Sequence, residues 1–241
     1  MAQQKMNSKL SEWIKQGFFL YKNNFLVLIV VTFLAYALSS FLAALVTGPM
    51  LMGVVAARES AIAQILIMYL MLAMSNVAFS ILGGPLLAGV ALVTLGLLDR
   101  KKPNPNIGNL FKGFHYFLQA FLFILVWSVI NVILQGLAPL ILSPVLLSVV
   151  PAILSIVIGT LTMFGLFLIV DQQRTFLQAS MESIKRARQH FWLFAAVVLV
   201  AGAISLAGLL ACGVGVVVTA PIYLCVLAVV YRDVYKQPAK V

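Results

Sequence analysis

Charged side chains are scarce in this sequence of 241 residues. Asp, Glu, Lys and Arg make up 9% of it, against about 25% in a typical soluble chain. Hydrophobic residues make up 63%, and the mean hydropathy is +1.10. A soluble domain of this composition would lack polar side chains for its surface, and disordered or nucleic-acid-binding chains need more charge. The composition therefore excludes these classes, and with them a nucleic-acid partner, and predicts that lipid surrounds most of the chain.

Residues suited to catalysis or metal binding are few as well. The histidines are His115 and His190, and the cysteines are Cys212 and Cys225. None of them has the spacing of a zinc site or a catalytic triad, and the glycine-rich stretches lack the Lys and Ser/Thr of a phosphate-binding loop. We therefore expect no enzyme activity, no metal and no cofactor. Placed on the predicted helices, the two cysteines would be about 15 Å apart, so we expect free thiols.

Apolar runs of spanning length dominate the rest of the chain, since about 20 helical residues cross a hydrocarbon core of about 30 Å. The predicted fold class is all-α: a polytopic transmembrane helical bundle of six spans in three hairpins. We expect an interfacial helix in 1–24, a membrane domain in 25–232 and a cytoplasmic tail in 233–241. The predicted spans are 25–46, 62–83, 117–135, 149–170, 191–211 and 216–231. The first has full spanning length, so we expect a retained anchor and no cleaved signal peptide.

The second span is followed by more apolar sequence. Gly83, Gly84 and Pro85 interrupt the run, and the stretch 85–98 then continues without a polar face. It is about 21 Å long as a helix, which is too short to cross the bilayer. We therefore expect a kinked half-helix at the inner side, covered by other helices or by a neighbouring protomer.

Basic residues predict the topology. They lie in clusters between the apolar runs, and with six spans every cluster falls on the same side, leaving only Arg58 on the other. Positively charged loops are retained in the cytoplasm. We therefore expect both termini to be cytoplasmic. The clusters are Lys5, Lys9, Lys15 and Lys22; Arg100, Lys101, Lys102 and Lys112; Arg174, Lys185, Arg186 and Arg188; and Arg232, Lys236 and Lys240.

An internal repeat supports three hairpins, each preceded by a basic amphipathic segment. Gly17, Phe18 and Phe25 match Gly113, Phe114 and Phe121 at identical spacing. Apolar residues at helical spacing predict helices that lie flat among the headgroups, the second beginning behind Asn109 as its N-cap. These segments would either bind anionic lipid nonspecifically as a collar, or dock a protein partner or sense lipid. The apolar positions are Leu10, Trp13, Ile14, Gly17, Phe18 and Tyr21; Leu110, Phe111, Phe114, Phe117, Leu118 and Phe121; and Leu177, Met181, Ile184 and Phe191.

Two sets of polar residues are candidates for a site. Asp99, Asp171 and Asp233 recur at the hairpin ends beside basic residues, where helix caps or ion pairs are the commoner role and a functional site is the alternative. Ser128, Asn131 and Gln135 form a stripe that we expect to face Ser75, Asn76 and Ser80. This stripe either holds helices together by hydrogen bonds or lines a polar path or headgroup site. The predicted spans contain no charged residue, so we expect no ion-coupled transport.

Several motifs between residues 80 and 235 resemble a known group of proteins. They are Gly84-Pro85-Leu-Leu-Ala-Gly89, Lys102-Pro103, Asn109-Leu-Phe-Lys-Gly-Phe114, Gly213-Val-Gly215 with Pro221, and Tyr231-Arg232-Asp233. This layout is similar to bacterial inner-membrane proteins related to the membrane domain of glycerophosphoryl diester phosphodiesterase. The resemblance implies a bacterial inner (plasma) membrane protein. It does not imply the phosphodiesterase activity, which belongs to a separate soluble domain in the fused members.

Two classes of function fit these features. The first is a non-catalytic, membrane-organising or envelope-homeostasis protein that self-associates and binds lipid, with anionic headgroups at its cytoplasmic face and an unidentified protein partner left open. The second is a passive channel, or a lipid or small-molecule transporter without ion coupling.

Overall fold

The computed structural model describes residues 2–56, 61–100, 106–141, 144–206, 208 and 214–235. In these ranges every regular element is helical, which confirms the all-α class. The elements are α1 (Ala2–Asn23), α2 (Phe25–Ala56), α3 (Ala61–Leu98), the 3-10 helix η1 (Ile107–Tyr116), α4 (Phe117–Ile141), α5 (Pro144–Thr162), α6 (Gly165–Gln172), α7 (Phe176–Gln189), α8 (Phe191–Leu206) and α9 (Val214–Tyr235).

Five stretches in the described residues are long and apolar enough to cross a membrane. Helices α7 and α8, bent by 103° at their junction, make a sixth if each bent pair is one span. The predicted span 149–170 consists of α5 and α6 with a turn between them, and α2 continues ten residues beyond the predicted end of the first span. The chain is therefore a multi-pass helical membrane protein.

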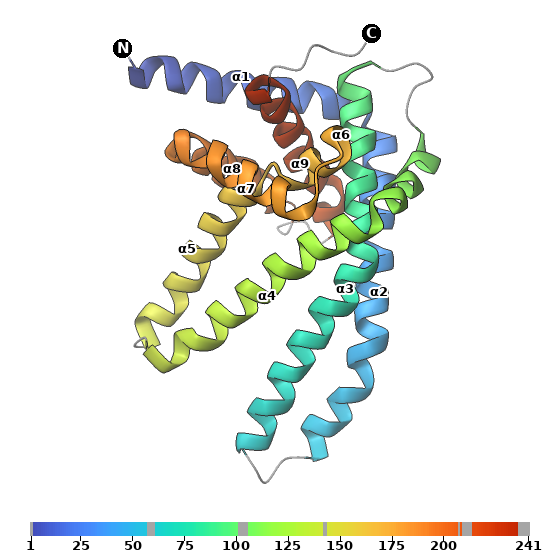
Figure 1. Ribbon diagram of the computed structural model, residues 1–241, viewed down its shortest axis with the longest axis vertical. Coiled ribbons are helices and arrows are strands. Elements are labelled where there is room, and N and C mark those ends of the chain that lie inside the picture. Colours follow the sequence, from blue (N-terminus) through green and yellow to red (C-terminus); the bar gives the residue numbers. More distant parts are fainter. Residues whose placement is uncertain are drawn as a thin grey trace.

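The hairpins converge at one end and separate at the other (Figure 1). Helices α2 and α3 run side by side, and α4 and α5 lead away from them, so that the two hairpins diverge downward in the view. Helices α1, α6 and α7 lie at the upper end, where α3 and α9 also finish. We call this the converging end.

Helix α1 runs across the converging end, transverse to the long hairpin of α2 and α3 (Figure 1). Part of its apolar face is covered by protein, because Trp13 stacks on Phe194 of α8 and Tyr21 is buried. Burial raises the pKa of the Tyr21 phenol, and its hydroxyl donates a hydrogen bond of 2.8 Å to the carbonyl of Val218 in α9. Phe18, on the predicted apolar face, remains half exposed.

Helix α3 passes Pro85 without ending, so the stretch 85–98 continues the second span instead of forming a separate half-helix. Leu86, Val90 and Val93 in this stretch are almost completely buried. Their cover comes from the same chain, because α3 packs on α2, η1 and α9. No neighbouring protomer is needed to shield this apolar surface.

The second basic segment begins earlier than predicted. Asn106 has an extended backbone and precedes the 3-10 helix η1, so Asn109 lies inside the helix and is not its N-cap. The two glycines of the internal repeat have a shared role here. A Cβ on Gly113 would collide with the Pro85 carbonyl of α3, and a Cβ on Gly17 would lie 2.8 Å from the Cα of Val226 in α9. Both glycines allow one helix backbone to touch another.

This close packing yields a stability prediction. We expect Gly113→Ala to lower the free energy of unfolding by about 1–3 kcal/mol, because the new methyl group meets backbone atoms that cannot move aside. Gly48→Ala is the matched control, since a Cβ there meets nothing within 4 Å and alanine is the better helix former by about 0.5–1 kcal/mol. Reversible unfolding in detergent measures both. Equal stability of the two variants would contradict the packing account.

Candidate functional site

An ion cluster joins the ends of all three hairpins. Arg232 of α9 donates to Asp99, which follows α3, through Nη2 (2.6 Å) and Nε (3.0 Å). The same guanidinium donates to Asp171 of α6 through Nη1 (2.8 Å) and Nη2 (3.1 Å). The side chains of Arg232, Asp99 and Asp171 are 14%, 5% and 10% exposed. We call these three residues the Arg232 clamp.

Further hydrogen bonds support the clamp in addition to its two ion pairs. The hydroxyl of Tyr231 donates to Asp171 Oδ2 at 2.9 Å, and Gln172 donates to that hydroxyl at 3.4 Å. Asp99 and Asp171 lie at helix C-termini, where the helix dipole disfavours a negative charge. Neither acid therefore gains from a capping role, and the shared arginine is what stabilises them.

Asp233, the third of the acids at the hairpin ends, has a different environment. Asp233 accepts a hydrogen bond from the Trp13 indole of α1 at 3.2 Å and lies 3.7 Å from Lys9 Nζ. This ion pair is about half exposed on both sides, so its contribution to stability is small. Asp233 thus connects α1 to α9 but does not join the clamp.

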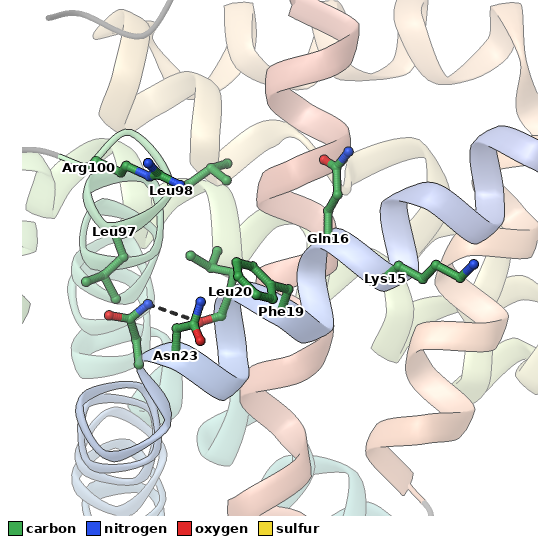
Figure 2. A pocket seen from close by; sticks show the side chains of 9 residues that line it. Lys15, Gln16, Phe19, Leu20, Asn23, Leu97, Leu98 and Arg100 are labelled. Atoms are coloured by element: carbon green, nitrogen blue, oxygen red, sulfur yellow. Dashed lines mark hydrogen bonds between the residues drawn. The ribbon is translucent and has the colours of Figure 1, made fainter.

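An open cavity of about 730 Å³ lies beside the clamp, between α1 and the end of α3 (Figure 2). We call it the α1–α3 notch. Its polar lining residues are Lys15, Gln16, Asn23, Asn24 and Arg100, and its apolar ones are Phe19, Leu20, Leu97 and Leu98. In Figure 2, Lys15 and Arg100 lie on opposite sides of the notch. Among the described residues, neither Lys15 nor Arg100 forms an ion pair with an acid.

Arg100 holds an unusual backbone conformation at the rim of the notch. Its φ is 52°, in the left-handed region, and its N–H donates to the Leu97 carbonyl, which ends α3. A residue with a side chain pays about 1–2 kcal/mol for this conformation, whereas glycine does not. Asp99, one residue earlier, is fixed by the clamp, so the clamp determines where Arg100 lies.

A second cavity occupies the matching place in the next repeat. The spacing that aligns Gly17 with Gly113 also aligns Phe19, Leu20 and Asn23 with His115, Tyr116 and Gln119. The latter three line a cavity of about 300 Å³ together with Gln173 and Arg174, at the end of α6. Gln173, like Arg100, is left-handed, with φ 53°. The internal repeat therefore produces two cavities of similar construction.

The described hydrogen bonds of the predicted polar stripe lie within single helices or join α4 to α5. Asn131 bonds the Trp127 carbonyl in its own helix and accepts from Ser155 of α5 at 3.3 Å. On α3, Asn76 and Ser80 bond carbonyl groups one turn earlier. Within the described residues no hydrogen bond joins this stripe (Ser128, Asn131) to Ser75, Asn76 or Ser80, and the side chain of Gln135 lies outside the description.

Arg232 and the α1–α3 notch were not identified from the sequence. The repeat aligned Asp233 with Asp99 and Asp171, and it is the neighbouring Arg232 that points inward. The available signal was the residue order at the third hairpin end: Arg232 precedes Asp233 there, whereas Arg100 and Arg174 follow Asp99 and Asp171 at the other two ends. Cys225 is a free, buried thiol, and Cys212 lies outside the described residues.

The clamp predicts a strong asymmetry among substitutions. Arg232→Met leaves two carboxylates buried without a cation, so we expect the free energy of unfolding to fall by about 3–5 kcal/mol. The triple variant Asp99→Leu, Asp171→Leu and Arg232→Met removes every charge and is expected to recover most of that loss.

The matched control for the clamp is Lys9→Met, which breaks the exposed ion pair with Asp233 and is expected to cost no more than about 1 kcal/mol. Chemical unfolding in detergent compares the four proteins. An Arg232→Met variant as stable as the original protein would show that the clamp does not hold the hairpin ends.

Comparison of the chain with protein-family models, curated proteins and solved structures finds no match. The resemblance carried by the motifs of residues 80–235 therefore stays a prediction, and the function has to be argued from the geometry of the chain.

Proposed function

We propose that this chain is a non-catalytic, multi-pass membrane protein that binds an anionic lipid headgroup in the α1–α3 notch. We further propose that it self-associates and has a membrane-organising role in a bacterial inner membrane, with both termini cytoplasmic. The single observation that carries the lipid-binding proposal is the mixed chemistry of the notch, set at the ends of long apolar helices.

The lining of the notch matches a phospholipid at the membrane surface. Lys15 and Arg100 supply two cations, and Gln16, Asn23 and Asn24 supply amide groups. Charged donors make the stronger hydrogen bonds to phosphate, and basic pockets at the ends of membrane helices are suited to anionic headgroups. Leu97 and Leu98 of α3 provide apolar surface for the first part of the lipid chains.

The strained backbone of Arg100 supports a role for its side chain. A glycine at this position would end α3 without the left-handed penalty. An arginine here is consistent with use of its guanidinium at the notch, since backbone strain concentrates at functional positions. The cavity of the second hairpin does not repeat this feature, because its arginine, Arg174, lies 3.8 Å from Glu182 and the left-handed residue there is Gln173.

For self-association, we propose the poorly covered face of α4 as the contact between copies. Only 11% of the most apolar part of Ile107–Leu134 is buried within the chain. Leu118, Val129 and Ile133 are among its exposed side chains. Lipid or a second copy of the protein has to cover this face in the membrane.

The variant Arg100→Gly separates lipid binding from stability. The protein in phosphatidylcholine nanodiscs is compared with the protein in nanodiscs containing phosphatidylglycerol, and the difference in Tm reports headgroup binding. We expect Arg100→Gly to be at least as stable as the original protein in phosphatidylcholine, since the backbone strain is relieved, and to lose most of the Tm gain in phosphatidylglycerol.

Arg188→Gln, which removes one exposed charge from α7 away from the notch, is the control and is expected to keep that gain. If Arg100→Gly keeps the full gain, or if Arg188→Gln loses as much of it as Arg100→Gly does, the notch is not the headgroup site.

A further inference from the structure

A second kind of cavity lies within the membrane part of the chain, away from the notch. It has a volume of about 690 Å³ and lies between α2, α5, α8 and α9. We call it the intramembrane cavity. Its lining includes Thr32, Phe33 and Tyr36 of α2, Gly159 of α5, Gly202 of α8 and Tyr223 of α9. Phe33 and Tyr36 are about half exposed on the outer surface of the bundle, so the cavity opens toward the lipid.

Thr32 carries a buried hydroxyl without a partner. The residue is 1% exposed, and its Oγ1 has no hydrogen bond in the described structure. The serine hydroxyls that line the same cavity are bonded: Ser155 to the carbonyl of Pro151 and to Asn131, and Ser205 to the carbonyls of Ala201 and Thr219. A buried polar group left unpaired costs free energy, which a ligand with an acceptor oxygen would recover.

Two glycines leave part of the cavity volume unfilled, because they have no side chains. A Cβ built on Gly159 or on Gly202 meets nothing within 4 Å, although both residues are inside helices, where glycine is unfavourable relative to alanine. They come from different helices and line the same space. The cavity therefore results from the choice of residues and not from a gap that larger residues could not fill.

The membrane around the helices limits what enters the cavity. Its lining is mostly apolar and it opens among spanning helices, where the surrounding molecules are lipid chains. The acceptor oxygen that such a chain carries is its ester carbonyl. We propose that the intramembrane cavity binds an acyl chain of a membrane lipid, and that the ester carbonyl accepts a hydrogen bond from Thr32. This site is separate from the headgroup site in the α1–α3 notch.

The test uses two zwitterionic lipids that differ only at the proposed acceptor. Diacyl phosphatidylcholine has ester carbonyls, and its dialkyl ether analogue has none. The purified full chain is titrated with each lipid in detergent, and bound lipid is counted by native mass spectrometry. A hydrogen bond of this kind predicts about a fivefold preference for the ester lipid. We expect Thr32→Val to remove the preference and to raise Tm in lipid-free detergent, because valine has the same shape without the unpaired hydroxyl.

Filling the cavity provides a second, independent variant. We expect Gly202→Leu to abolish binding of both lipids at this site while the protein stays folded, because the added side chain points into open space. Gly48→Leu, whose Cβ also meets nothing within 4 Å, is the matched control outside the cavity and is expected to bind as the original protein does.

Equal binding of ester and ether lipid by the original protein, or an ester preference that survives Thr32→Val, would overturn the role of Thr32. Unchanged binding in Gly202→Leu would overturn the cavity as the site. Arg100→Gly is expected to keep the ester preference, so a failure of the headgroup proposal and a failure of this one are distinguishable.

Discussion

The charge of Arg232 is the constraint on which the arrangement of the hairpins depends. A guanidinium in an apolar helix is stable only when carboxylates neutralise it and accept its hydrogen bonds. Asp99 and Asp171 do both, and each comes from the end of a different hairpin. Since neither acid nor the arginine is stable when buried alone, the ends of α3, α6 and α9 have to meet at one place. The converging end follows from that requirement.

Close helix contacts around the clamp complete the packing of the converging end. Glycines let helix backbones touch where side chains would keep them apart, at Gly113 against α3 and at Gly17 against α9. Helix α1 is thereby held across the ends of the other helices, with Trp13 bonded to Asp233. Away from this end the two long hairpins diverge (Figure 1). The proposed lipid sites follow this division: a polar notch beside the clamp and an apolar cavity between the spanning helices.

The sequence predicts the elements better than their contacts. The apolar runs and the polar breaks between them predict the helical class and most helix positions, because a membrane leaves few other ways to bond the backbone. The continuation of α3 through Pro85 was missed, since a proline in a membrane helix is tolerated where neighbouring helices cover the freed groups. The expected facing of the two polar stripes stays a prediction, because the described hydrogen bonds of Asn131 and Asn76 do not join α4 to α3. Helix periodicity alone does not specify which faces of two helices meet.

The candidate sites could be predicted only in part from the sequence, because they depend on contacts between helices. Asp99 and Asp171 stand out as recurring acids, but which of Arg232 and Asp233 joins them depends on a rotation of about 100° along α9. The α1–α3 notch is lined by Lys15 and Arg100 from opposite sides, although the two residues are 85 positions apart in the sequence. The unpaired hydroxyl of Thr32 has no signature at all in the sequence, because threonine in a membrane helix ordinarily bonds a carbonyl of its own helix.

The most direct test of the convergence of the three hairpins is labelling of single cysteines by a membrane-impermeant reagent. In a background without Cys212 and Cys225, cysteines are placed at Lys101, Arg174 and Lys236, each within four residues of a member of the clamp, and at Arg58. The account predicts that the first three are labelled from the same side of the membrane and that Arg58→Cys is labelled from the other. Labelling of Arg174→Cys or Lys236→Cys from the side opposite to Lys101→Cys would contradict it, because the clamp cannot form across a bilayer.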